Sequence, residues 1–287
     1  MLKTRIITAL VLLPIVLAGL FVFPPWAWGL FTFAVVMCAG WEWRQFCGLS
    51  REGAVAYLLL TAAYAAFIVV AWLKGGIAGV NFYQLKQSGF SVAAIFWLIV
   101  APLWLAKAWR PKSPLLMAIA GWIVILPTLL ALLSLREISP WVFLSFAAIV
   151  WVADIAAYFV GKRFGKTKLA PAISPGKTLE GALGGTVGVV IYFFIWRALV
   201  DVAGPGADSG LWALRSHGLI LLGLFALFSI LSIVGDLFES WMKRGAGLKD
   251  SGKLLPGHGG ILDRVDALTS TLPLAGLYMM LQSQAQA

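Results

Sequence analysis

The residues with the greatest chemical potential lie in one polar stretch near the end of the chain, positions 236–266. Its 31 positions hold ten of the 34 charged residues of the chain, five acidic and five basic. Asp263 and Asp266 are three residues apart where an apolar segment begins, so on a helix their Cβ atoms lie about 5–6 Å apart on one face. Asp236 lies at the end of the preceding apolar segment. We expect the two segment ends to gather Asp236, Asp263 and Asp266 into an oxygen-rich site.

Such a site suits Mg²⁺, which takes oxygen ligands, keeps several waters and accepts phosphate oxygens as further ligands. The backbone of positions 256–260, Pro-Gly-His-Gly-Gly, lets the amides of Gly259 and Gly260 approach a phosphate closely. His258 serves either as a hydrogen-bond donor to phosphate or in proton transfer, and the donor role is favoured because phosphate oxygens are already ionised. The plainer alternative is a solvated loop in which the aspartates pair with Arg264 and nearby lysines.

A second group of polar residues spans positions 154–181. Asp154 and Tyr158 are one helical turn apart inside an apolar segment, where an ionisable residue is costly and faces a cavity or a partner. The run from Ser174 to Glu180, Ser-Pro-Gly-Lys-Thr-Leu-Glu, is similar to a phosphate-binding turn that caps a helix, although it lacks the glycine spacing GxxxxGK[ST]. Lys177 supplies a point charge for phosphate. The other cations here serve equally well as topology markers or contacts to anionic lipid heads; they are Lys162, Arg163, Lys166 and Lys168.

The composition indicates which elements position these residues. The chain has 287 residues, of which 61% are hydrophobic and 12% charged, with a mean hydropathy of +0.92. A soluble domain carries about 25% charged residues. Repeated apolar runs of about 17–22 residues are long enough to cross a hydrocarbon core of about 30 Å. Because these runs are continuous and do not alternate, they indicate helices, and the chain is predicted to be an all-α polytopic integral membrane protein.

The net charge of +10 is compatible with nucleic-acid binding, but the basic residues lie between the apolar runs and are better explained by membrane topology. The two cysteines, Cys38 and Cys47, offer neither a disulfide framework nor zinc-binding spacing. The segment from Trp41 to Arg44 is charged and aromatic, which is typical of an anchor at the membrane interface. We expect no nucleic-acid partner.

Nine spans are predicted, with the N-terminus in the cytoplasm and an uncleaved first span: residues 6–23, 26–40, 54–73, 92–106, 115–135, 141–160, 181–200, 217–237 and 267–280. This topology places 17 of the 22 Lys and Arg residues on the inner side. The loop after the sixth span and the stretch after the eighth then share the cytoplasmic face, where a nucleotide can reach both. We expect one membrane domain, residues 1–287, with N-terminal spans in 1–135 and the active site in 141–283, in a bacterial inner membrane.

Together, the two polar groups resemble the phosphatidate cytidylyltransferase family, also called CDP-diacylglycerol synthases. The family signature Ser-x-x-Lys-Arg, Lys-Asp, Pro-x-His-Gly-Gly and Asp-Arg-x-Asp is matched by Ser240, Lys243, Arg244, Lys249, Asp250, Pro256, His258, Gly259, Gly260, Asp263, Arg264 and Asp266. The upstream pattern is matched by Asp154, Ala157, Tyr158, Phe164, Gly165, Lys166, Ser174, Pro175, Lys177, Thr178, Glu180 and Gly181. Family members often carry an aromatic residue where Leu179 stands.

The resemblance implies that CTP and phosphatidic acid condense to CDP-diacylglycerol and pyrophosphate, in phospholipid biosynthesis. It implies Mg²⁺ on Asp236, Asp263 and Asp266, with a second cation such as K⁺ as an option, and a homodimer among membrane lipids. Charge on the phosphates would be stabilised by Lys177, Lys243, Arg244, Lys249 and Arg264, with His258 beside them. The nucleotide is expected near Asp154, Ser174, Lys177, Thr178, Glu180, Gly259 and Gly260.

Three other functions compete with this interpretation. An ion transporter is expected to carry acids near the bilayer midplane and repeated halves, whereas the acids here cluster at span ends and the sequence shows no repeat. A CDP-alcohol phosphotransferase is typified by DGxxAR…GxxxDxxxD, which does not occur in this chain. A lipid or polyprenol kinase is the nearer alternative, and it would transfer the γ-phosphate and release a nucleoside diphosphate.

Overall fold

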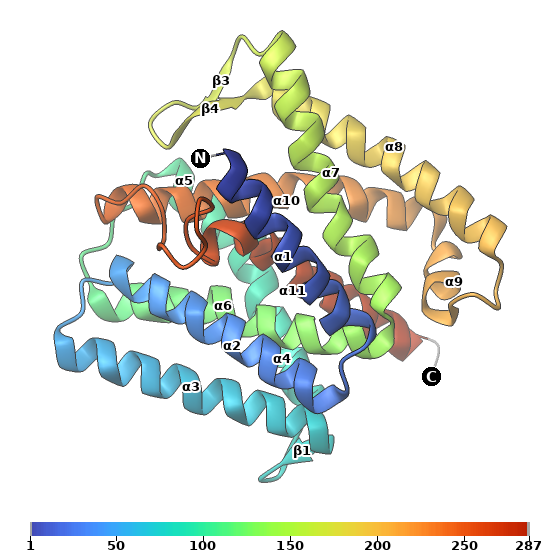
Figure 1. Cartoon of the computed structure of the whole chain (residues 1–287), viewed down its shortest axis with the longest axis horizontal. Coiled ribbons are helices and arrows are strands. Elements are labelled where there is room, and N and C mark those ends of the chain that lie inside the picture. Colours follow the sequence, from blue (N-terminus) through green and yellow to red (C-terminus); the bar gives the residue numbers. More distant parts are fainter. Residues whose placement is uncertain (1, 286–287) are drawn as a thin grey trace.

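The computed structural model describes residues 2–285, and it shows a bundle of long helices with two short hairpins (Figure 1). The side chains of Lys3 and Arg5, counted above as cytoplasmic, lie outside the described part. The first half contains α1 (Leu2–Phe21), α2 (Pro25–Trp43), α3 (Arg51–Lys74), β1 (Gly76–Ile77), β2 (Val80–Asn81), α4 (Phe82–Ile95), α5 (Ala101–Ala106) and α6 (Pro114–Ile138). The second half contains α7 (Pro140–Phe164), β3 (Lys168–Ala170), β4 (Ser174–Thr178), α8 (Leu179–Ala203), α9 (Ser209–Arg215), α10 (Gly218–Gly245) and α11 (Leu262–Ala285).

The prediction of a multi-pass helical membrane protein is confirmed. Within the described residues, six helices are long and apolar enough to cross a membrane: Arg51–Lys74, Phe82–Ala106, Pro114–Ile138, Pro140–Phe164, Leu179–Ala203 and Gly218–Gly245. The second of these joins α4 to α5 through a π-helical turn at Phe96–Val100. The other three predicted spans, 6–23, 26–40 and 267–280, fall in α1, α2 and α11. Their crossing of the membrane, and the side of the N-terminus, stay predictions.

The two hairpins were not predicted. Strands β1 and β2 pair antiparallel with Gly76 opposite Asn81, and β3 pairs antiparallel with β4 so that Lys168 lies opposite Thr178. The segment that the sequence suggested as a turn, from Ser174 onward, is therefore largely a strand. Pro175 is tolerated there because a strand in a two-stranded hairpin pairs on one side only.

Helix α8 lies against α7 along a row of glycines. A Cβ on Gly185 would lie 2.9 Å from the carbonyl oxygen of Ala153, and one on Gly188 would lie 2.6 Å from the Cβ of Ala156. Small residues of this kind let two helices approach closely in a bilayer, where burial from water contributes little to helix association. The β3–β4 hairpin joins α7 to α8 (Figure 1). The close packing of the two helices therefore holds the hairpin at the helix ends that the topology prediction places on the cytoplasmic side.

Helix α11 lies in the interior and contacts α10, α6, α4 and α7. It approaches α10 closely at Gly235, where a Cβ would lie 2.6 Å from the Oγ of Ser270 and 2.8 Å from the carbonyl oxygen of Asp266. The Ser270 hydroxyl donates to the carbonyl oxygen of Leu231 at 2.8 Å. The close approach at Gly235 thus brings the neighbouring residue Asp236 beside the first turns of α11.

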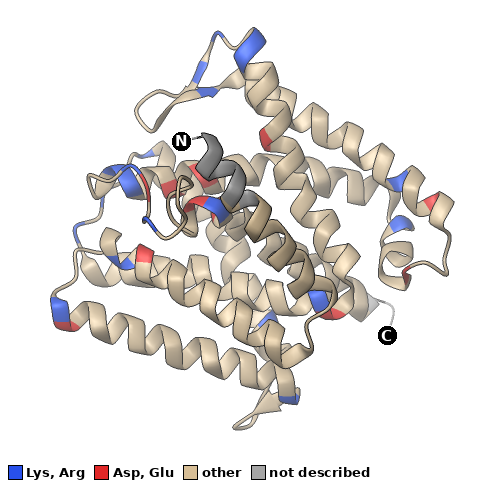
Figure 2. Ribbon diagram, viewed as in Figure 1, with Lys and Arg blue, Asp and Glu red and all other residues tan. Residues whose placement is uncertain are grey.

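Charged residues are unevenly distributed over the fold. Figure 2 shows them on the α10–α11 loop, on the β3–β4 hairpin and at the start of α3, whereas most of the helical surface is uncharged. The two polar groups found in the sequence meet where Lys177 of β4 forms an ion pair with Asp236 of α10.

The glycine contact between α7 and α8 yields a testable prediction. Gly188→Leu should lower the midpoint of thermal unfolding, because the new side chain must displace α7 at a cost of about 1–3 kcal/mol. Gly223→Leu is the matched control, since a Cβ on Gly223 of α10 meets nothing within 4 Å. Intrinsic fluorescence of the purified protein in detergent measures both. Equal midpoints for the two variants would contradict the close-packing account.

Candidate active site

A buried lysine joins the end of α10 to the start of α11. Lys243 Nζ lies 2.6 Å from Glu239 Oε2 and 2.6 Å from Asp263 Oδ1. Glu239 is 4% exposed and Lys243 is 8% exposed, so water contributes little to their solvation. A buried charge of this kind is tolerated only with partners, and removing one partner is strongly destabilising. Lys243 therefore fixes how the two helix ends lie against each other.

Asp263 is held by four donors. Its Oδ2 accepts hydrogen bonds from the amides of Ser251 (2.9 Å) and Gly260 (2.8 Å) and from the Ser251 hydroxyl (2.9 Å), while Oδ1 meets Lys243. Asp263 precedes the predicted membrane span of α11. Burial alone would raise its pKa, but the hydrogen bonds from Lys243 and from the Gly260 amide outweigh burial and hold the pKa below its ordinary value. The carboxylate is thus a fixed anion that organises the α10–α11 loop.

Glu42 of α2 is the site residue that the sequence analysis missed. It is fully buried, although it was predicted to belong to an interface anchor. Oε1 accepts from the amide of Ile261 at 2.9 Å, and Oε2 accepts from the amide of Leu262 at 2.8 Å. Oε2 also lies 2.9 Å from the Ser251 hydroxyl, whose single proton is shared between Glu42 and Asp263. Amides at a helix N-terminus lack partners within the helix and favour an anion. Glu42 therefore caps α11 from a distant helix.

The α10–α11 loop closes around the Glu42 carboxylate without room for further atoms. A Cβ on Gly252 would lie 2.5 Å from Glu42 Oε1, and one on Gly260 would lie 2.4 Å from Glu42 Oε2. Of the residues beside Glu42 in the predicted anchor, Trp43 is buried as well, whereas Trp41 is half exposed and the Arg44 guanidinium lies 3.8 Å from the centre of its ring. The position of Trp41 and Arg44 at a membrane interface stays a prediction. The signal that could have identified Glu42 is an acid within an otherwise apolar helix, which usually has a buried partner.

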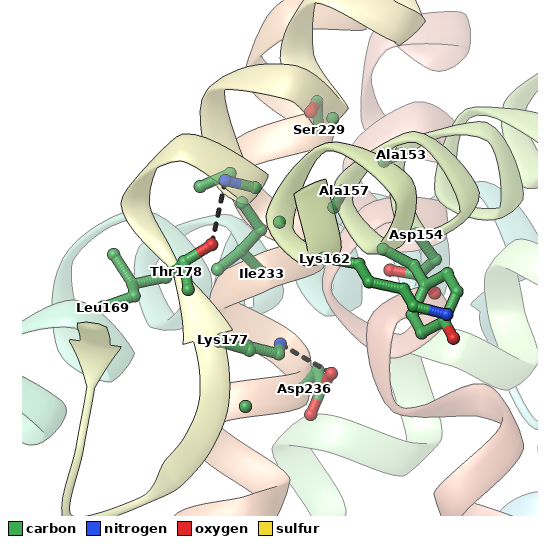
Figure 3. Close-up of a pocket in the computed structure, with 16 residues that line it drawn as sticks. Ala153, Asp154, Ala157, Lys162, Leu169, Lys177, Thr178, Ser229, Ile233 and Asp236 are labelled. Atoms are coloured by element: carbon green, nitrogen blue, oxygen red, sulfur yellow. Dashed lines mark hydrogen bonds and ion pairs between the residues drawn. The ribbon is translucent and has the colours of Figure 1, made fainter. Parts of the chain in front are cut away.

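A polar cavity of about 400 Å³ lies between α7, β4, α8 and α10 (Figure 3). Lys177 of β4 reaches across it, and its Nζ lies 2.6 Å from Asp236 Oδ2 on α10. Asp154 and Lys162 line the cavity from α7. The cavity therefore presents two cations and two carboxylates to whatever enters it, which suits a phosphate chain accompanied by a metal ion.

The hairpin that carries Lys177 is fixed at its base. The Thr178 hydroxyl accepts from the amide of Gly181 at 3.1 Å and so caps α8, as the sequence predicted (Figure 3). The Glu180 carboxylate accepts from the amides of Lys166 and Thr167 at 3.0–3.1 Å. These contacts restrict the hairpin strand and thereby the direction in which Lys177 extends.

The three predicted metal ligands are only partly brought together. Burial and, next, the negative charge of Asp236 raise the pKa of Asp266 to about 7. Asp263 is instead committed to Lys243 and the loop amides. Across the part of the chain that the structure describes, no three His, Cys, Asp or Glu side chains form a ready-made metal site. The ligand set of Asp236, Asp263 and Asp266 stays a prediction.

The charge of the region nevertheless fits a divalent cation. The carboxylates that influence one another electrostatically are Asp154, Asp236, Glu239, Asp263 and Asp266, and the cations among them are Lys177, Lys243 and Arg264. These five carboxyl groups outnumber the three cations by two, and a bound divalent cation would favour the ionised form of each carboxyl group. One carboxylate oxygen, Glu239 Oε1, is also buried without a hydrogen-bond partner. Oxygen donors with this surplus are what Mg²⁺ requires.

The remaining predicted residues lie on the loop and the hairpin. The Arg244 and Lys249 side chains are exposed, and Arg244 donates to the carbonyl oxygen of Leu248 at 3.1 Å. Gly259 has φ +85°, and a Cβ there would lie 2.6 Å from Asp263 Oδ2. Glycine is therefore required at this position by the backbone conformation and by the nearby Asp263 carboxylate. Ser174 lies at the start of β4, opposite Ala170.

Two comparisons with known proteins cover nearly the whole chain. Residues 3–282 match the model of the cytidylyltransferase family. The chain is 39% identical to a phosphatidate cytidylyltransferase of Pseudomonas aeruginosa, over 96% of this chain and 95% of that protein. It is 36% identical to one of Haemophilus influenzae, over 95% and 96%, and 33% identical to one of Thermotoga maritima, over 96% and 94%.

The burial of Glu42 yields a second testable prediction. Glu42→Gln should lower both the unfolding midpoint and the turnover rate, because an amide group cannot accept from three donors at once and an unsatisfied buried donor costs about 1–3 kcal/mol. Glu52→Gln is the matched control, since Glu52 is exposed at the start of α3. Thermal unfolding and initial rates measure the effect. A Glu42→Gln protein that equals the Glu52→Gln protein in both would contradict the role of Glu42 as a distant cap.

Proposed function

Because the chain belongs to the cytidylyltransferase family and is a nucleotidyltransferase, we propose that it condenses CTP with phosphatidic acid to give CDP-diacylglycerol and pyrophosphate. In this reaction an oxygen of the lipid phosphate attacks the α-phosphorus of CTP. The bond from that phosphorus to the β-phosphate bridging oxygen breaks, and pyrophosphate leaves with the bonding electrons. The observation that carries the proposal is the polar cavity, where Lys177 and Asp236 meet at one end of a membrane bundle.

Lys177 is suited to holding a phosphate of the nucleotide. It comes from a hairpin fixed by Thr178 and Glu180, so its ammonium group is already placed when the substrate arrives. Preorganised charge of this kind stabilises a developing anion without the cost of reorganisation. In the free protein Asp236 neutralises Lys177, and a phosphate would take over that part of the interaction.

The surplus carboxylates are suited to a metal ion. Asp236 and Asp266 would hold Mg²⁺, with Asp263 close by, and the bound ion would neutralise and align the phosphates. A second cation such as K⁺ belongs to the same proposal. Lys243 offsets Glu239 and Asp263, so it controls how much negative charge is left for the metal.

The loop residues are suited to the leaving pyrophosphate. Arg244 and Lys249 are exposed cations on either side of the turn at 245–248, and the amide of Gly259 follows His258, whereas the Gly260 amide already donates to Asp263 Oδ2. Together they offer donors to an anion that leaves toward water. His258 would act as a donor, since the attacking phosphate oxygen needs no base.

The active site is proposed to face the cytoplasm of a bacterial inner membrane. Support comes from the distribution of cations, with 17 of 22 Lys and Arg residues on the predicted inner side. Both polar groups lie on connections that this topology assigns to that face. CTP is water-soluble and phosphatidic acid resides in the membrane, so a site at the interface serves both. The homodimer stays a prediction.

The products distinguish this proposal from the lipid kinase alternative. Purified protein with dioleoyl phosphatidic acid, Mg²⁺ and CTP labelled at the α-phosphate should transfer the label to the lipid phase and release pyrophosphate. Release of CDP, with label remaining in water, would support the kinase and contradict the proposal.

Lys177→Met should raise the KM for CTP by about tenfold or more, because a charge-assisted contact to phosphate is worth about 1.5–3 kcal/mol. Lys168→Met is the matched control, since Lys168 is an exposed cation in the other strand of the same hairpin. Equal KM values for the two variants would contradict the assignment of Lys177 to the nucleotide.

A further inference from the structure

A second cavity, here called the apolar cavity, shares a wall of α7 with the polar cavity. It has a volume of about 510 Å³ and is lined by α1, α2, α6, α7, the α10–α11 loop and α11. This volume falls within the range of about 300–1,000 Å³ that is typical of ligand pockets. On α2 the lining runs from Ala39 to Trp28, which is about 16 Å at about 1.5 Å per residue. That is close to half of a hydrocarbon core of about 30 Å.

Most polar groups in the lining are turned away from the cavity by bonds to their own helices. The Thr32 hydroxyl donates to the carbonyl oxygen of Trp28, that of Thr128 to Val124, and that of Thr269 to Asp266. These threonines therefore do not offer their protons to the cavity. Apart from one end, the walls are suited to a hydrocarbon.

That end is formed by His258 and Arg264. In the described structure neither side chain has a hydrogen bond or an ion pair within the protein, and His258 Nδ1 is buried without a partner. An arginine beside a histidine is a common arrangement for an anion, and Arg264 is suited to two-point contact with a phosphate. The apolar cavity thus combines a hydrocarbon wall with an anion-binding end.

The apolar cavity and the polar cavity meet along α7. Trp151 lines the apolar cavity, whereas Asp154, about one helical turn further along α7, lines the polar cavity. A ligand with an anionic head at Arg264 would therefore present that head to the Lys177–Asp236 site. The opposite side of the apolar cavity faces the surface, because Leu13 of α1 is 53% exposed and Trp151 of α7 is 42% exposed. The two helices meet at one end, where the ring centres of Phe21 of α1 and Trp141 of α7 lie 4.9 Å apart.

We propose that the apolar cavity binds one acyl chain of the phosphate-bearing lipid substrate, which enters between α1 and α7 with its phosphate at Arg264 and His258. The inference rests on the proposed function and adds to it the place of the lipid. It differs from the sequence analysis, which assigned the active site to residues 141–283, because α1, α2 and α6 supply much of the wall. The first spans thereby acquire a role in substrate binding.

The test narrows the apolar cavity and varies the length of the lipid. Val35 is half-buried in the lining, midway along the α2 wall, and Val35→Trp should obstruct an acyl chain. The kcat/KM for dioleoyl phosphatidic acid should fall by about tenfold or more, because each excluded methylene loses its transfer free energy. The kcat/KM for dihexanoyl phosphatidic acid and the KM for CTP should stay within about twofold. Ala34→Trp is the matched control, because Ala34 is the exposed neighbour on α2.

The comparison between lipids separates the outcomes. If Val35→Trp lowers turnover of both lipids equally, or of neither, or if Ala34→Trp reproduces the chain-length effect, the acyl-chain assignment is overturned. If wild-type protein makes no CDP-diacylglycerol from either lipid, the proposed function itself fails. A measurement of lipid binding then still tests whether the acyl chain occupies the apolar cavity.

A binding measurement does not depend on turnover. Phosphatidic acid with a photoreactive diazirine at the middle of one acyl chain should label peptides of α1, α2, α6 or α11 in wild-type protein. Val35→Trp should reduce that labelling by about tenfold, in line with the loss in kcat/KM. Labelling confined to α8, α9 and α10, or unchanged by Val35→Trp, would place the chain elsewhere and overturn the proposal.

Discussion

The buried ammonium group of Lys243 is the interaction on which the site depends. It lies 2.6 Å from both Glu239 and Asp263, and so it offsets two carboxylates that would otherwise repel each other where α10 meets α11. With Asp263 fixed, the amides of Ser251 and Gly260 are fixed as well, and the loop that carries His258 follows. Because a buried charge without a partner is so costly, this arrangement has few alternatives of similar free energy.

A membrane bundle explains why the site is built from helix ends. Chemistry on a water-soluble nucleotide needs charges, and charges are tolerated where helices meet the interface. Glu42 ends α2, Lys177 precedes α8 and Asp263 starts α11, whereas Asp236 lies within α10, which continues past the predicted span end at 237 to Gly245. Close packing at Gly235 and along the glycines of α8 brings these ends together. The result is a polar cavity and an apolar cavity that share a wall of α7 at Asp154 and Trp151, which suits one substrate from water and one from the bilayer.

The helices were predictable because long apolar runs have few other structures in a bilayer. The predicted span 141–160, for example, lies within α7, and the helix start beside Asp263 was recognisable from spacing. Glu42 was not predicted as a site residue because its partners lie 209–220 positions away, and no local pattern reports such contacts. The strand at Ser174–Thr178 was missed because a short, polar hairpin lacks alternating hydrophobicity. Spacing put Asp263 and Asp266 on one face, but whether Asp263 binds a metal or Lys243 depends on how α10 and α11 pack.

The central claim is that the carboxylates beside Lys177 and Lys243 hold a divalent cation for phosphate transfer. Crystals of the protein grown with CTP and Mn²⁺ in place of Mg²⁺ test it most directly, because the anomalous scattering of Mn²⁺ locates the ion. The account predicts a peak coordinated by oxygens of Asp236 and Asp266 in the polar cavity, in contact with the nucleotide phosphates. Nucleotide phosphates bound to Lys177 without a peak beside these aspartates would contradict it.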